Sequence, residues 1–195
     1  EQTENGSEWS GGSKGSIAGV TAFTMKNVPS NFFFCIYNAR PQTADIFFED
    51  ALMACVFYGM PILMESNKPR MLYHFTNRGY SGFSLRRFDK PTNRLSPIEK
   101  QIGGVPGTSP DVNQMHYTAI ESYIQKYVGI YSQGDDVYPI REEGEIGSLP
   151  FNSILRDWMG FNISNRTAFD ITMATGYALM GCNRESYKPE IEDRG

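Results

Sequence analysis

Residues 60–67 read MPILMESN, and the interpretation of the whole chain starts from this stretch. Its apolar run is uninterrupted and ends at the carboxylate of Glu65. A run this short, bounded by Gly59 and Ser66, is typical of a strand that is buried on both faces. Strands of this kind lie inside α/β sheets, where ligands collect beyond the carboxyl ends. Residues 60–65 therefore predict a buried strand, and Glu65 either caps the sheet edge or belongs to a site.

The size and composition fit one α/β domain with its own core. The chain has 195 residues, of which 40% are hydrophobic and 13% aromatic, and this excludes a disordered chain. No stretch approaches the roughly 20 apolar residues that span a membrane, and no secretory leader is present. The three cysteines lack zinc-site spacing and fit a reduced compartment. We expect a flexible loop at 1–15, a domain at 16–182 and a charged tail at 183–195.

The first half of the chain has clear patterns. Residues 16–26 and 31–38 are rich in β-branched and aromatic side chains, and the short turn between them predicts an antiparallel pair. Thr43 is a good cap for a helix at 44–58, where apolar residues recur at helical spacing. The opposite side of this helix carries Asp45, Glu49 and Asp50, which we interpret as a solvated face.

The second half alternates helices with loops. We expect helices at 68–77, 111–128, 151–158 and 164–181, the last one capped by Ser164. The region 78–110 is rich in glycine and proline and predicts a long irregular loop, which is usually functional or mobile. Two further expectations are a flap at 103–110 and a short strand near 137–140.

Two acidic residues are expected at buried positions, unlike the acidic residues of the 44–58 helix. Glu65 ends the buried strand, and Asp170 is the sole acid of the late helix, beside small residues that pack closely. A buried carboxylate needs a cation, a donor or a metal ion. Carboxylates that converge from separate elements suit Mg²⁺ or Mn²⁺, and two such ions about 3.5–4 Å apart can clamp a phosphodiester. The alternative is that each acid caps structure or pairs with an arginine such as Arg166.

A basic window follows Glu65 directly. Residues 66–101 contain eight basic and two acidic residues, a local charge of +6 in a chain of net charge −4. A basic face with interleaved aromatic residues suits a polyanion groove, whereas the alternative is ordinary surface charge. Charge alone makes the following residues candidate phosphate contacts: Lys68, Arg70, Arg78, Arg86 and Arg87.

Two longer segments carry a family resemblance. Residues 44–68 read ADIFFEDALMACVFYGMPILMESNK, and residues 165–170 read NRTAFD. With the order of the intervening elements, they resemble the C-terminal nuclease domain of the large terminase subunit of tailed bacteriophages and prophages, most closely the divergent type of gut Bacteroidetes phages. The resemblance implies a ribonuclease H-like mixed sheet flanked by helices. It also implies an endonuclease that cuts concatemeric viral DNA during packaging with two divalent metals, Mg or Mn.

The resemblance assigns roles to particular residues. Glu65 and Asp170 match the second and third catalytic metal ligands of the family, and Asn67 matches a position that contacts phosphate. The first ligand, an Asp, lies in the family on a strand before the loop that opens this chain. We therefore expect a fragment that lacks its first strand and its first catalytic Asp, and whether it is active on its own stays an open question.

The implied partners are double-stranded DNA, the terminase ATPase domain, the portal and the small terminase subunit. The implied location is the host bacterial cytoplasm, without a membrane partner. Two alternatives stay open. One is another ribonuclease H-like nuclease, of the junction resolvase or transposase type. The other is a non-catalytic module that binds DNA or the portal.

Overall fold

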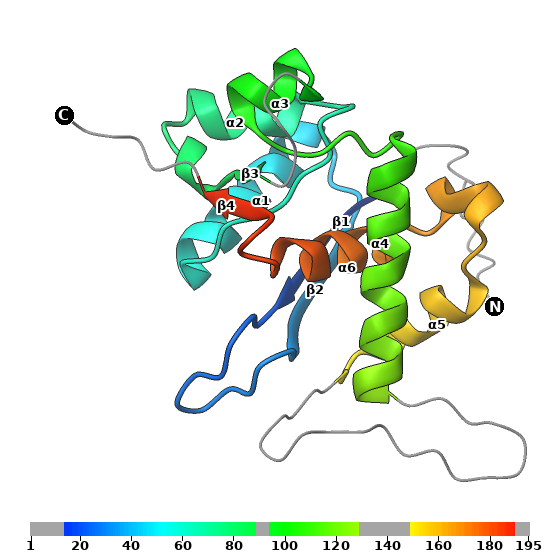
Figure 1. The fold of residues 1–195 in the computed structure, drawn as a ribbon. Helices are drawn as coiled ribbons and strands as arrows, with labels where there is room; N and C mark the ends of the chain where they lie inside the picture. Colours follow the sequence, from blue (N-terminus) through cyan, green and yellow to red (C-terminus); the bar gives the residue numbers. More distant parts are fainter. Residues whose placement is uncertain (1–13, 89–93, 129–148, 190–195) are drawn as a thin grey trace, which may run out of the picture.

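A computed structural model of the chain describes residues 14–88, 94–128 and 149–189 (Figure 1). The fold is mixed α/β, with two small antiparallel sheets among helices. Residues 1–13 of the loop expected at 1–15 and the strand expected at 137–140 lie outside the described residues. Within the described part, no helix is long and apolar enough to cross a membrane.

The predicted antiparallel pair is confirmed. Strand β1 (Gly15–Val20) pairs with β2 (Phe33–Ala39). The first strand is shorter than the expected 16–26 because the chain turns at Thr21. The buried hydroxyl of Thr21 donates to the carbonyl of Pro29 at 2.5 Å, and the backbone N–H of Asn31 donates to the Thr21 carbonyl. These bonds satisfy the polar groups of the turn and end the ladder.

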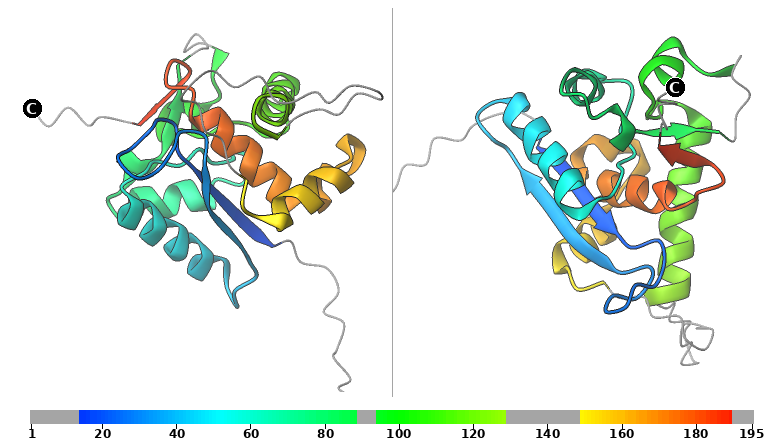
Figure 2. Two further views of the ribbon diagram at one scale, coloured as in Figure 1. Left: turned by 90° about the horizontal axis from the view of Figure 1, so that it is seen from below. Right: turned by 90° about the vertical axis from the view of Figure 1, so that its left-hand side faces the viewer.

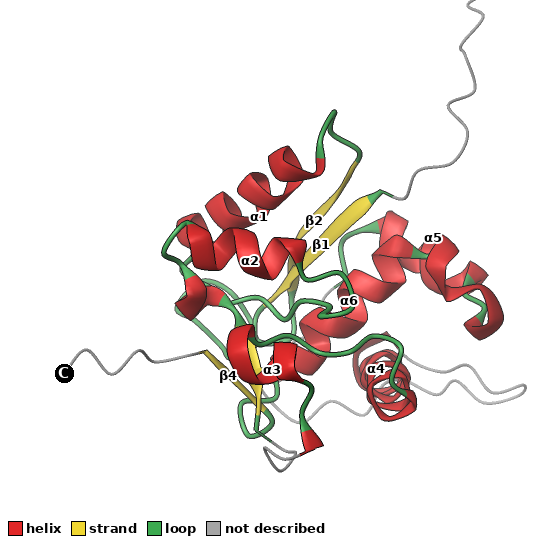
Figure 3. Cartoon of the chain, turned by 90° about the horizontal axis from the view of Figure 1, so that it is seen from above, coloured by secondary structure: helices red, strands yellow, loops and turns green. Residues whose placement is uncertain are grey.

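Helix α1 (Ala44–Tyr58) has the predicted bounds. The Thr43 side chain accepts a hydrogen bond from the N–H of Ile46, and the helix ends at Gly59, whose φ of 63° suits glycine. Helix α2 (Arg70–Asn77) follows and packs beside α1. Figures 2 and 3 show that α1 covers one face of the β1–β2 pair, while α6 lies on the other face.

Residues 60–65 form a buried, extended segment. Leu63 and Met64 are buried, as predicted. The segment is not a regular strand, because its pairing consists of two isolated parallel bridges, from Ile62 to Ser84 and from Glu65 to Val105. It therefore runs beside two separate stretches of chain, around Ser84 and around Val105, without forming a continuous ladder with either.

The prediction of one long irregular loop at 78–110 is wrong. The region contains a short 3₁₀ helix (Ser81–Phe83), strand β3 (Leu85–Arg87) and helix α3 (Pro97–Ile102). Helix α3 begins at a capping box, in which Ser96 and Glu99 exchange side-chain to backbone hydrogen bonds. Local capping thus supplies structure that glycine and proline content does not reveal.

The prediction of a charged tail at 183–195 is also wrong for its first residues. Strand β4 (Tyr187–Pro189) pairs antiparallel with β3. Tyr187 is 2% exposed and belongs to the core cluster that contains Leu63, Leu85 and Tyr177. Burial of this one aromatic side chain holds the segment against the domain.

Three helices complete the described fold. Helix α4 (Pro110–Tyr123) continues as a π-helical turn (Ile124–Val128), which matches the predicted helix at 111–128. Helix α5 (Asn152–Gly160) matches the one expected at 151–158. Helix α6 (Asp170–Gly181) packs between β1 and α4 (Figure 1).

The start of α6 differs from the prediction. Ser164 does not cap this helix, because a 3₁₀ segment (Ile163–Ala168) precedes it and Asn165 has non-helical backbone angles. The N-cap position is Phe169. Asp170 consequently lies in the first turn of α6, where the positive end of the helix dipole favours a carboxylate.

Candidate functional site

Glu65 lies at the end of the buried segment, half-buried. One of its carboxylate oxygens, Oε1, accepts a hydrogen bond from the side-chain amide of Asn67 at 3.1 Å. The backbone N–H of Ser66 donates to the Val105 carbonyl, which fixes the turn directly after Glu65. The predicted pair Glu65 and Asn67 is therefore held together by its own loop.

Gly107 lies against Glu65. A Cβ at Gly107 would overlap both Oε1 of Glu65 and the hydroxyl of Tyr177, since both atoms lie within 2.6 Å of its position. Glycine is thus required for the carboxylate and the hydroxyl to share this space. Tyr177 comes from α6 and is 8% exposed. Burial raises the pKa of Tyr177 above its usual value, and the negative charge of Glu65 adds to this effect.

Arg166 holds Gly107 from the other side. Its guanidinium donates hydrogen bonds to the Gly107 carbonyl and to the side-chain oxygen of Asn113 on α4. The alternative in which Arg166 pairs with one of the two predicted acids therefore has no support here. One arginine instead ties the 3₁₀ segment, α4 and the Gly107 loop together.

His116 adds a second buried polar group. It is fully buried on α4, packs against Gly176 and meets the Tyr177 ring edge-on at 5.3 Å. Its Nε2 lies 3.1 Å from the Met173 carbonyl, so this nitrogen carries the hydrogen. Burial lowers the pKa of His116, which keeps the ring neutral at pH 7. The other ring nitrogen, Nδ1, has no partner among the described residues.

Asp170, the second predicted acid, is also half-buried. It accepts a hydrogen bond from the backbone N–H of Lys14. Burial raises the pKa of Asp170, the charge of Asp157 acts in the same direction, and Lys14 and Lys68 oppose them. The contact that the Glu65 loop makes with α6 lies further along the helix, where Tyr177 is beside Glu65.

Asp157 is an acid that the sequence did not single out. Its carboxylate accepts from the backbone N–H and from the hydroxyl of Thr172, at 2.6 and 2.7 Å. It therefore caps the first turn of α6 from the neighbouring helix α5. A cap supplied by another helix leaves no local sequence pattern, which is why capping rules miss it.

Part of the basic window forms ion pairs with α1. Glu49 accepts two hydrogen bonds from Arg78, at 2.7 and 3.2 Å, and lies 2.8 Å from His74. These bonds lower the pKa of Glu49. Arg70 pairs with Asp45 at 3.4 Å, and both side chains are well exposed. The acidic face of α1 is thus a partner for the basic window, which corrects its interpretation as a purely solvated face.

Two further arginines are engaged within the fold. Arg86 donates to the carbonyls of Lys100 and Gln101, both at 2.7 Å, and so closes the C-terminal end of α3. Arg87 is 7% exposed and pairs with Asp111 at 3.1 Å. Their positions serve packing and give no support to the predicted phosphate contacts.

Asn67 and Lys68 differ from these arginines. Both residues are exposed, and both lie in the loop that follows Glu65. Among the six predicted contacts they are the ones placed directly beside the candidate acid.

The prediction of a mobile flap at 103–110 is wrong. Gly103, Gly104, Val105 and Gly107 are buried. The backbone N–H of Gly104 donates to the Leu85 carbonyl, and that of Val105 donates to the Met64 carbonyl at 2.9 Å. The segment is therefore a fixed wall of the site.

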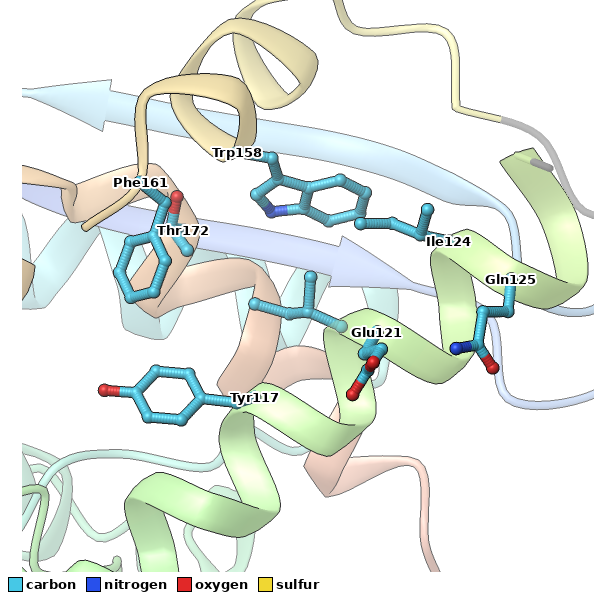
Figure 4. Close-up of a pocket in the computed structure, with 8 residues that line it drawn as sticks. Tyr117, Glu121, Ile124, Gln125, Trp158, Phe161 and Thr172 are labelled. Carbon is cyan, nitrogen blue, oxygen red and sulfur yellow. The ribbon is translucent and has the colours of Figure 1, made fainter. Parts of the chain in front are cut away.

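A separate pocket lies between α4 and α5 (Figure 4). It has a volume of about 340 Å³ and a largely apolar lining that includes Tyr117, Trp158 and Phe161. Neither Glu65 nor Asp170 lines it. In the described ranges, the surroundings of Glu65 and Asp170 included, no three Asp, Glu, His or Cys side chains form a group that could hold a metal ion.

Comparison of the chain with protein-family models, curated proteins and solved structures gives no match.

Proposed function

We propose that this chain is the nuclease domain of a phage large terminase subunit, a metal-dependent DNA endonuclease that cuts concatemeric viral DNA during packaging. One observation carries the proposal. Glu65 ends a buried segment and lies beside Tyr177 of α6, the helix whose first turn carries Asp170. Two half-buried carboxylates that lie far apart in the sequence are thus on neighbouring elements.

The donor set fits Mg²⁺ or Mn²⁺ in kind, because both ions prefer carboxylate oxygens. Glu65 and Asp170 would hold the metal, and a third acid would come from the family's opening strand. When bound, two ions stabilise the attacking and leaving oxygens of the phosphodiester. Lys68 and Asn67 would bind the phosphate next to the scissile bond, and the fixed segment around Gly107 would keep Glu65 in place.

The finer fold that we propose is ribonuclease H-like. The order of an antiparallel pair, a helix and a parallel-bridged segment supports it. Within the described residues, β1 pairs with β2 alone, and residues 60–65 are bridged to Ser84 and Val105. A ribonuclease H-like sheet would have a further strand between β1 and residues 60–65.

The same proposal names partners and location. The substrate is double-stranded DNA, and the partners are the terminase ATPase domain, the portal and the small subunit. The protein acts in the host bacterial cytoplasm.

A second candidate is a non-catalytic module that binds DNA or the portal. Asp170 already accepts a hydrogen bond from the backbone N–H of Lys14, which ties the residue before β1 to the first turn of α6 and gives the carboxylate a structural role. This candidate predicts DNA affinity that falls steeply with salt, without cleavage.

The deciding experiment measures Mn²⁺-dependent plasmid cleavage by the full-length protein. We expect Glu65→Ala and Asp170→Ala each to lower the rate by more than about a hundredfold, since even outer-shell changes cost about 10- to 100-fold. Glu185→Ala, at an exposed acid of the described chain, is the matched control and should cleave normally. Unchanged cleavage by Glu65→Ala would exclude its role as a ligand.

A further inference from the structure

The hydroxyl of Tyr177 is buried and has no hydrogen-bond partner among the described residues. Buried hydroxyl groups in folded proteins almost always have a partner. An unpaired one therefore calls for an explanation. The sequence gives no reason for a tyrosine here, because phenylalanine would fill the same apolar space between α4 and α6.

The nearest charged group to this hydroxyl offers an explanation. The hydroxyl oxygen of Tyr177 and Oε1 of Glu65 both lie within 2.6 Å of the position that a Cβ would occupy at Gly107. They lie beside each other in the space that the missing Gly107 side chain leaves open, without a hydrogen bond between them in this structure. Hydrogen bonds to reactive groups are often long or misaligned in the unliganded protein and tighten in the complex.

The position of Gly107 is itself fixed. Arg166 donates to the Gly107 carbonyl and to Asn113, and the Val105 backbone is hydrogen-bonded on both sides, to Met64 and to Ser66. The Gly107 backbone beside Glu65 and Tyr177 is therefore held in place. The hydroxyl and the carboxylate can approach each other only by rotation of their own side chains.

We propose that Tyr177 is a positioning residue for Glu65: its buried hydroxyl donates a hydrogen bond to the Glu65 carboxylate, which is long in the metal-free protein and tightens when the carboxylate holds a divalent metal ion. The inference rests on the proposed function and extends it by one residue. The hydrogen bond would leave one carboxylate oxygen oriented toward the metal and would limit rotation of the side chain. Partners of this kind around metal ligands typically change metal affinity by about 10- to 100-fold.

The test measures Mn²⁺ binding to the full-length protein by isothermal titration calorimetry. We expect Tyr177→Phe to weaken Mn²⁺ binding about tenfold. Its melting temperature without metal should stay the same or rise, because the variant removes an unpaired buried hydroxyl. Tyr73→Phe, at an exposed tyrosine of α2, is the matched control and should change neither quantity.

The outcomes separate this inference from the proposed function. If Glu65→Ala loses Mn²⁺ binding while Tyr177→Phe binds like the wild type, the ligand role stands and the positioning role is wrong. A drop in melting temperature with unchanged affinity also overturns the inference, since it shows a purely structural hydroxyl.

A metal-free measurement covers the case in which the wild-type protein binds no Mn²⁺ and the proposed function fails. The ¹³C shift of the Glu65 carboxylate, assigned by its loss in Glu65→Gln, reports directly on the neighbouring hydroxyl. Tyr177→Phe should move this shift, and Tyr73→Phe should not. An unmoved shift overturns the inference on its own.

Discussion

Two polar regions of this molecule contrast with each other. Between α1 and α2, Glu49 pairs with Arg78 and His74 at the surface, and its carboxylate oxygens have partners. Between α4 and α6, His116 and Tyr177 are buried, and each has a polar atom without a partner among the described residues. The surface region satisfies its charges and holds two helices together. The buried region keeps hydrogen-bonding capacity unused beside a candidate metal ligand.

The contrast shows that counting charges along the sequence locates charged residues but does not reveal which contacts they make. The basic window does locate charged residues, but Arg78, Arg86 and Arg87 serve contacts within the fold. Arg166 lies outside the window and contacts the loop beside Glu65. An arginine's role here depends on what surrounds it, and the following predictions measure that difference.

The largest effect is expected at the contact between α6 and α4. Gly176→Ala would place a Cβ inside the His116 ring, and neither group can move away from the closely packed helices. We expect it to lower the free energy of unfolding by about 3 kcal/mol, the upper part of the range for overpacked cores. Urea denaturation of the described domain within the full-length protein measures this value.

Two further variants make this test specific. Gly160→Ala meets a single ring atom of Phe169 at 3.3 Å and should have a much smaller effect. The double variant His116→Ala with Gly176→Ala should lose less unfolding free energy than the sum of the two single losses, because the ring no longer occupies the space. Strictly additive losses would show that α6 does not pack on His116 in this way.

The next effect compares the same substitution in the two regions. Arg166→Met removes hydrogen bonds to the Gly107 carbonyl and to Asn113 in a half-buried place. It should destabilise the protein by about 2 kcal/mol, as expected for hydrogen bonds that involve a charged group. Arg78→Met breaks an exposed ion pair, and its effect should be small and should shrink further at high salt.

Urea denaturation at low and high salt measures both variants in one series. Equal losses for Arg166→Met and Arg78→Met would contradict the distinction between the buried and the surface region. A loss at Arg166 that disappears in high salt would mean that its contacts are solvent-exposed ion pairs instead.

Local patterns in the sequence predicted the local structure well. The helix at 44–58 has its exact bounds because Thr43 and Gly59 are strong end signals. The strand pair was predicted because a short turn connects two β-rich segments. Patterns of this kind involve residues that are neighbours in the chain, so a single sequence contains all the information they need.

Contacts between distant segments escaped prediction. The pairing of β4 with β3 and the cap that Asp157 gives to α6 join segments with no shared local signal. Sequence reasoning placed Glu65 and Asp170 on elements that the structure brings side by side, since Tyr177 of the helix that carries Asp170 lies beside Glu65. It missed Tyr177 and His116 because a buried aromatic residue in an apolar stripe looks like ordinary core.

The smallest effect is a pH dependence that separates the two regions. Burial lowers the pKa of His116 below its ordinary value of 6.5 in the folded protein. Above that pH both folded and unfolded chains carry a neutral ring, so the full stability is present. Below it the unfolded chain binds a proton that the folded chain excludes, and stability is lost as the pH falls toward the folded pKa. The slope from this group is at most about 1.4 kcal/mol per pH unit.

Glu49 in the surface region has the same sign but a different window. Its pKa is lowered mainly by the hydrogen bonds from Arg78, so its contribution is lost as the pH falls below the ordinary value of 4.5. Urea denaturation between about pH 7.5 and pH 5 therefore isolates the buried ring. His116→Gln keeps an N–H donor for the Met173 carbonyl and cannot be protonated, so its stability should fall less over this range. Asp170 titrates alike in both proteins and cancels in the difference. Parallel curves for wild type and variant would show that His116 takes up a proton in the folded protein as readily as in the unfolded chain.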